Sequence, residues 1–91
     1  MHALVVTVTI APGHDAEALA YLQSYVVPGV QQIPGLVSAY WLAPRDGQGL
    51  SVLLFESKEA AQAAAAGLPN VPRADFATLG TVEVREVLAQ I

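Results

Sequence analysis

The order in which two kinds of apolar pattern follow one another is the strongest constraint on how this chain can fold. Apolar and β-branched residues run together over four stretches that predict strands: 4–10, 36–42, 50–55 and 82–88. Apolar residues at helical spacing mark two longer stretches, roughly 14–33 and 58–66. These helical stretches fill the first and third gaps between strands, so the predicted order is β-α-β-β-α-β.

That order is the split βαβ, or ferredoxin-like, plan: an α+β fold with one antiparallel sheet and both helices on one face. The other face should meet water, yet the first predicted strand has no polar side. One set of alternate residues is Leu4, Val6, Val8 and Ile10, and the other is Val5, Thr7 and Thr9. Antiparallel sheets with one solvated face normally alternate more cleanly. We therefore expect something to cover the second face of the sheet.

Composition points to a second copy of the chain as that cover. The 91 residues are enough for one domain, 1–91, and 54% of them are hydrophobic while only 13% are charged. Average proteins have about 25% charged residues. One small domain can bury only part of so much apolar sequence, so the chain is predicted to form an oligomer.

Charge, cysteine content and hydropathy exclude several classes of function. A net charge of −4 with four Lys and Arg residues argues against nucleic-acid binding. The absence of cysteine excludes disulfides and thiolate sites. The N-terminal residues lack the basic region of a signal peptide, and no apolar run approaches the roughly 18 residues of a membrane span. A cytoplasmic protein without membrane contact is expected.

Turn and helix-breaking residues refine the predicted elements. Pro28, followed by Gly29, predicts a kink or break late in the first helix. Residues 44–49 are predicted to form a hairpin loop longer than two residues, and 68–79 a loop with one helical turn near 73–78. Ser57 is a predicted helix cap. The last strand alternates sharply and is predicted to lie partly at a sheet edge or to meet another subunit.

Few side chains could carry chemistry. His14 suits either a surface or capping role or a catalytic one, and Arg45 lies in the predicted hairpin loop. Tyr21 and Tyr25 are one helical turn apart, and Tyr40 and Trp41 must point to opposite faces of their strand. The aromatic residues either complete a core or line a pocket. The two histidines have no carboxylate at ligand spacing, so no metal site is expected.

Three segments resemble the antibiotic biosynthesis monooxygenase (ABM) type of the dimeric α/β-barrel superfamily. They are 33–41 with the preceding Pro28, 54–60 and 82–88. The resemblance implies a homodimeric barrel of two sheets packed face to face, with an apolar pocket between each sheet and its helices. Some members oxygenate polyphenols or quinols without a cofactor, and others degrade haem. The haem-degrading pattern has Asn on the first strand and His on the second helix, where this chain has Thr7, Thr9 and alanines, so haem degradation is not expected.

Two function classes remain open at this point. The first is a binding barrel without chemistry of its own, holding a small aromatic or apolar ligand between sheet and helices near Tyr21, Tyr25, Tyr40 and Trp41. The second is a cofactor-independent monooxygenase acting on a phenol or quinol, with His14, Tyr40 and Arg45 as catalytic candidates. The scarcity of buried ionisable groups favours the first class. The oxygenase activity of some family members favours the second. Neither requires a cofactor.

Overall fold

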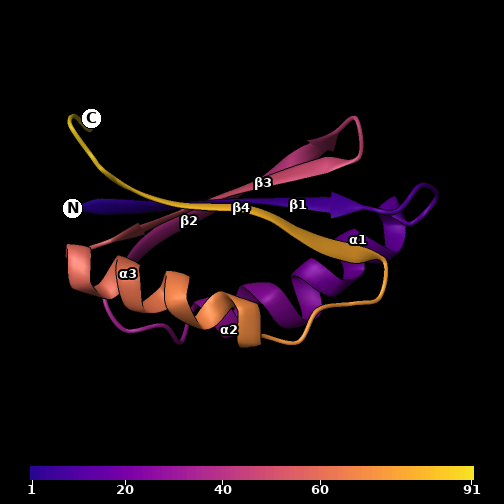
Figure 1. The fold of residues 1–91 in the computed structure, drawn as a ribbon, viewed down its shortest axis with the longest axis horizontal. Coiled ribbons are helices and arrows are strands. Elements are labelled where there is room, and N and C mark those ends of the chain that lie inside the picture. The colour runs from indigo at the N-terminus through magenta and orange to yellow at the C-terminus, as the bar shows by residue number, and fades with distance from the viewer.

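Four strands pair into one antiparallel sheet with all helices on one side (Figure 1). The computed structural model describes residues 1–91. The strand order is β2-β3-β1-β4. The strands are β1 (His2–Ile10), β2 (Leu36–Arg45), β3 (Gln48–Phe55) and β4 (Ala77–Glu86). This confirms the ferredoxin-like α+β plan, with β2 and β4 at the two edges as expected for the last strand.

The pairing register assigns each strand residue to one of two faces. Leu4 pairs with Leu53 on β3 and with Val84 on β4, and this set faces the helices. The neighbouring row, in which Val5 pairs with Val52 and Glu83, faces the opposite side. We call that side the open face. The core lies entirely on the helix side and consists of the following buried cluster: Leu4, Val6, Leu53, Phe55 and Ala61.

The second long helix packs closely on the sheet because it is made of small residues. It is α3 (Lys58–Gly67), and it contacts β1, β4 and β3. The Ser57 hydroxyl accepts the Ala60 N–H at 3.1 Å, which confirms the predicted cap. Gly35, with φ of +81°, lies against this helix so closely that an added Cβ would stand 2.8 Å from the Cβ of Ala60. Alanine and glycine therefore set the short distance between α3 and the chain entering β2.

The first long helix is interrupted in the middle. It runs as α1 (Asp15–Tyr21), a π-helical turn η1 (Leu22–Val26) and α2 (Val27–Val30). The Val27 N–H donates to the Leu22 carbonyl, five residues back. Pro28 has no N–H to give to the Ser24 carbonyl and its ring crowds that carbonyl, so a wider turn relieves both problems. The predicted distortion at Pro28 is confirmed.

This π turn also changes which side chains of the helix face the sheet. An uninterrupted helix would place Leu19 and Gln23 toward the sheet, but both are exposed. Ala18 and Leu22 are half-buried instead, whereas Val30, beyond the turn, packs on the core. A π turn contains one extra residue, so every inward position before it comes one residue earlier in the sequence.

Two predicted loops are wrong in their details. β2 and β3 continue to Arg45 and Gln48, which leaves a two-residue turn of Asp46 and Gly47 with φ of 54° and 78°. Two positive φ values define the type I′ hairpin, for which Asp-Gly is a favoured pair. The second loop contains a 3₁₀ turn, η2 (Leu68–Asn70), rather than a helical turn near 73–78. β4 begins at Ala77, five residues before the predicted start, and ends at Glu86.

Candidate functional site

Three aromatic side chains on the helix side form the first candidate region. Tyr21 and Tyr25 lie one turn apart with ring centroids separated by 5.2 Å and planes tilted by 36°. The Tyr21 hydroxyl donates to the Pro72 carbonyl at 3.2 Å, which ties the helix to the segment before β4. Trp41 pairs with Ser51 on the row of β2 that faces the helices, and it is half-buried. Tyr25 is 69% exposed, so this region is open to solvent on the helix surface.

The long helix covers the sheet less tightly than α3 does. None of the 16 residues of α1, η1 and α2 is buried, whereas α3 buries Ala61 completely. This helix connects β1 to β2 and therefore passes the β3 side of the sheet. The half-buried side chains there include Leu22, Val26 and Ala39. The long helix therefore buries its side chains less completely than α3 does.

Tyr40 does not join the other aromatic residues. It pairs with Val52 on the open face, and 57% of its surface is exposed. The sheet thus separates it from Tyr21 and Tyr25. One protomer does not bring Tyr40 together with the other predicted pocket residues, because alternation along β2 sends Tyr40 and Trp41 to opposite faces.

His14 stands at the start of α1, away from both aromatic regions. Its ring stacks on Phe76 with centroids 5.2 Å apart and planes 12° apart, and its Nδ1 lies 2.9 Å from Oε1 of Glu17. The side chain makes no capping hydrogen bond to the helix backbone. Its contacts instead hold the segment before β4 against the helix. The stacked geometry explains the position of His14 without a substrate.

Arg45 lies on the open face beside the hairpin turn. It borders a concavity of about 520 Å³ lined by Thr7, Thr9, Ala43, Arg45, Asp46, Gln48, Gly49 and Leu50. No local sequence pattern indicates this concavity, because the lining residues come from two hairpin strands and from β1. His14, Tyr40 and Arg45 occupy three separate places, so one protomer does not bring the catalytic candidates together.

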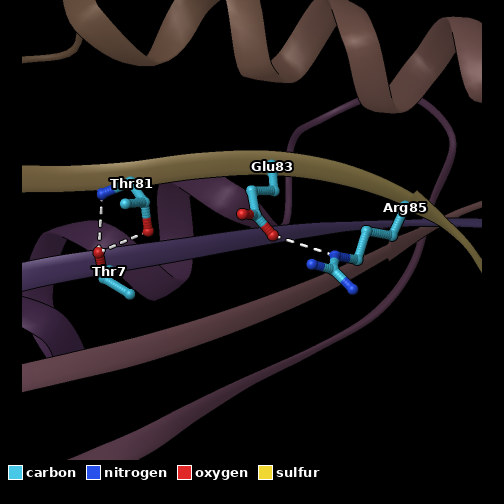
Figure 2. Close-up of polar contacts among 4 residues, drawn as sticks. All are labelled: Thr7, Thr81, Glu83 and Arg85. Carbon is cyan, nitrogen blue, oxygen red and sulfur yellow. Dashed lines mark hydrogen bonds and ion pairs between the residues drawn. The ribbon is translucent and has the colours of Figure 1, made fainter.

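The open face is apolar in the middle and polar along β4. Its apolar side chains include Val5 and Val52, with Tyr40 and Leu42 more than half exposed. Figure 2 shows the polar edge: Thr7 and Thr81 are joined at 2.7 and 2.9 Å, and Nε of Arg85 lies 3.0 Å from Oε2 of Glu83. The charged pair joins neighbouring residues of the same face on one strand. Along β4, the open face therefore carries a balanced ion pair beside an apolar surface.

A family model described as Antibiotic biosynthesis monooxygenase (ABM) matches residues 1–67, from β1 to the end of α3. The chain belongs to the ABM family. Among curated proteins, no sequence matches it. The family assignment confirms the resemblance found in the sequence.

Solved ABM-fold structures match the whole chain. The haem degrader MhuD of Mycobacterium tuberculosis superposes with a TM-score of 0.79 at 23% identity, covering 100% of this chain and 99% of that one. A Nitrosomonas europaea protein of unknown function, NE2512, gives 0.67 at 24% identity, covering 99% and 91%. The monooxygenase ActVA-Orf6 of Streptomyces coelicolor, in complex with nanaomycin D, gives 0.56 at 18%, covering 99% and 90%. At these identities the likeness establishes the fold.

The second long helix does not carry the histidine of the haem-degrading pattern. Helix α3 contributes alanines and no imidazole. His14 is engaged with Phe76 and Glu17, and His2 lies at the start of β1. No group of three or more His, Cys, Asp or Glu side chains could hold a metal ion.

None of the helices has the length and apolarity needed to span a bilayer.

Proposed function

We propose that this ABM protein binds a small planar aromatic or apolar ligand between its long helix and the β2–β3 side of the sheet, and that it works as a homodimer. The observation that carries the proposal is the contrast between the two helices. The 16 residues from Asp15 to Val30 bury no side chain, although they lie over a sheet whose other half is closed by α3. A ligand in this layer would complete the packing that the protein leaves unfinished.

The chemistry of that layer favours a neutral ring. Trp41 on β2 and Leu22 on the long helix are half-buried, and every fully buried residue of the chain is hydrophobic. Sites of this kind use apolar walls for affinity and a few hydroxyl or N–H groups for orientation. The indole of Trp41 can stack on an aromatic ligand, and tyrosine hydroxyls can hydrogen-bond a phenol.

The homodimer is supported by the open face. Tyr40 and Leu42 are 57% and 51% exposed there, next to Val5 and Val52. A soluble monomer rarely exposes a contiguous apolar surface larger than a few hundred Å². Pairing two open faces would remove both surfaces from water and would form the barrel expected from the sequence.

A cofactor-independent monooxygenase acting on a phenol or quinol is the second candidate, and the family match supports it. Such an enzyme needs a group that helps to deprotonate the substrate. His14 is paired with Glu17 and stacked on Phe76, Tyr40 lies on the open face, and Arg45 lies at the hairpin. Because these groups do not converge in a protomer, binding without oxygen chemistry is the better-supported function.

Fluorescence of the single tryptophan tests the binding site. Phenols, naphthols and quinols should quench Trp41 saturably, with a stoichiometry of one per protomer. A matched control moves the fluorophore to the other face with Trp41→Phe and Tyr40→Trp in one protein. Saturable quenching should be lost in that control, because the sheet lies between the open face and the proposed site. No saturable quenching of the native chain across the whole aromatic set would contradict the proposal.

Oxygen uptake separates the two candidate functions. With a quinol that quenches Trp41, oxygen consumption should equal the rate of the uncatalysed oxidation. A protein-dependent excess that is reduced in His14→Ala or Tyr40→Phe would support the monooxygenase instead. Variants must first be shown by circular dichroism to keep the native fold.

A further inference from the structure

The edge strand β2 contains an extra residue that turns Arg45 to the open face. Leu42 pairs with Leu50 and Arg45 pairs with Gln48, so three steps along β2 match two steps along β3. The extra residue lies between Leu42 and Arg45, as in a β-bulge. Without it, plain alternation from Leu42 would point Arg45 toward the helices.

The other edge strand, β4, has a bulge at the same end of the sheet. Its ladder with β1 shifts register between Val6 and Val8, where β4 has one residue more than its neighbour. This shift places Thr78 opposite Thr9 on the open face, although plain alternation from Glu83 would turn Thr78 to the helix side. Each bulge therefore adds one polar side chain to the open face.

Together with the two central strands, the bulges form a polar row across the hairpin end of the open face. Each strand contributes one residue, in the order Arg45, Gln48, Thr9 and Thr78. All four are exposed, and their side chains have no hydrogen-bond or ion-pair partner within the protomer. The first three border the concavity of about 520 Å³. Small-ligand sites commonly have volumes of roughly 300–1,000 Å³.

The functional groups of this polar row define the ligand chemistry that suits it. The Arg45 guanidinium can bind a carboxylate through two parallel hydrogen bonds. Threonine hydroxyls and the Gln48 amide both donate and accept hydrogen bonds, and so do the hydroxyls of a polyol. The Asp46 carboxylate also borders the concavity, so it would repel a second negative charge on the ligand. These features favour one carboxylate attached to a hydroxylated chain.

We propose that the polar row binds a small hydroxylated monocarboxylate of the sugar-acid class. Arg45 binds the carboxylate, and Gln48 and Thr9 bind hydroxyl groups further along the ligand. Neighbouring strands are about 4.8 Å apart, so the row offers these partners over about 10 Å from β2 to β1. The site goes beyond the proposed function, because the sheet separates it from the aromatic layer. It lies at the hairpin end of the open face, beside the apolar middle around Val5 and Val52.

Amide chemical shifts of the native protein, measured by ¹H–¹⁵N NMR, test the site with a matched pair of probes. Gluconate has the proposed chemistry, and sorbitol has the same hydroxylated chain without the carboxylate. Gluconate should shift the amides of Arg45, Gln48, Thr9 and Thr78 saturably. Sorbitol should bind about tenfold more weakly or worse, because it lacks the charge-assisted pair with Arg45. Equal responses to the two probes, or no saturable shift with gluconate at matched ionic strength, would overturn the proposal.

Removing the Arg45 charge should have the same effect as removing the carboxylate. Arg45→Gln keeps a long polar side chain and should raise the gluconate dissociation constant about tenfold. Lys58→Gln is the matched control, since it also removes one positive charge, but Lys58 begins α3 on the other side of the sheet. It should stay within about twofold of the native chain. Unchanged binding in Arg45→Gln, or equal weakening in both variants, would overturn the site.

Asp46→Asn tests the selection for a single charge. The turn should be kept, because Asn-Gly also suits a type I′ hairpin. Glucarate carries a carboxylate at both ends of the gluconate chain, so the native protein should bind it more weakly than gluconate. Asp46→Asn should reduce that difference about threefold. A native protein that prefers glucarate, or a difference that Asp46→Asn leaves unchanged, would overturn the assignment to a monocarboxylate.

Discussion

The hydroxyl of Thr7 accepts the backbone N–H of Thr81 at 2.7 Å and lies 2.9 Å from the Thr81 hydroxyl. It does so where the ladder between β1 and β4 shifts register, with Val6 paired to Val82 and Val8 to Leu79. Two residues of β4, Gly80 and Thr81, therefore stand opposite Thr7 alone, as in a β-bulge. A side-chain oxygen thus replaces the carbonyl that the shifted ladder cannot supply.

Removing that oxygen should weaken the sheet. Thr7→Val keeps the shape of the side chain but leaves the Thr81 N–H without its protein partner. We expect a loss of about 1 kcal/mol in the free energy of unfolding, measured by urea denaturation. Thr7→Ser retains the acceptor and should lose less than Thr7→Val. Equal losses in the two variants would show that the hydrogen bond contributes nothing.

Gly80 and Gly29 should respond in opposite ways to alanine. A Cβ on Gly80 would lie 3.0 Å from the Thr7 carbonyl oxygen and would also strike the Thr7 hydroxyl, so Gly80→Ala should destabilise the protein by about 2 kcal/mol. A Cβ on Gly29 meets nothing within 4 Å, and Gly29 lies in α2. Gly29→Ala should raise the stability by about 0.5–1 kcal/mol, because alanine is the better helix former. Thermal unfolding of both variants checks the signs.

Glutamate on the two faces of the sheet should separate assembly from folding. Val5 points to the open face, so Val5→Glu should give a folded monomer in which a charge blocks the proposed dimer contact. Leu53 is only 5% exposed and packs in the core, so Leu53→Glu should unfold the chain. Light scattering and circular dichroism distinguish these results. A Val5→Glu protein that remains a dimer would place the interface elsewhere.

Replacing Pro28 should leave the fold intact. The π turn before Pro28 already accommodates its missing N–H, and the ring also restricts the unfolded chain. These effects nearly cancel in Pro28→Ala, for which we expect a change of less than about 1 kcal/mol in chemical denaturation. Loss of cooperative unfolding would mean that the proline holds the π turn in place.

The sequence predicted the strands, the two long helices and their order because each depends on a local pattern. The continuous apolar and β-branched run over 4–10 gave β1, and the position of Pro28 gave the break in the first helix. Adjacent Tyr40 and Trp41 had to point to opposite faces, which the register confirms. The pocket that would have joined Tyr40 to Tyr21 contradicted this rule, and the structure separates them.

What the sequence did not predict depends on contacts between distant segments. β4 begins at Ala77 because Ile10 and Thr9 of β1 are there to pair with Ala77 and Thr78, although Gly80 interrupts the apolar pattern. Asp46 and Gly47 form the whole hairpin turn because the flanking residues remain paired in the sheet. Leu53 and Val52 look alike in sequence, and only the register with β1 decides which one is buried.

The π turn at Leu22–Val26 has a consequence for alignments. A relative whose helix keeps plain α geometry reaches the same packing with one residue fewer. A correct alignment of such a relative should therefore place a single-residue gap within these five positions. Aligned without that gap, residues 15–21 would be compared with neighbours one step out of phase, and inward-facing side chains would be matched to outward-facing ones.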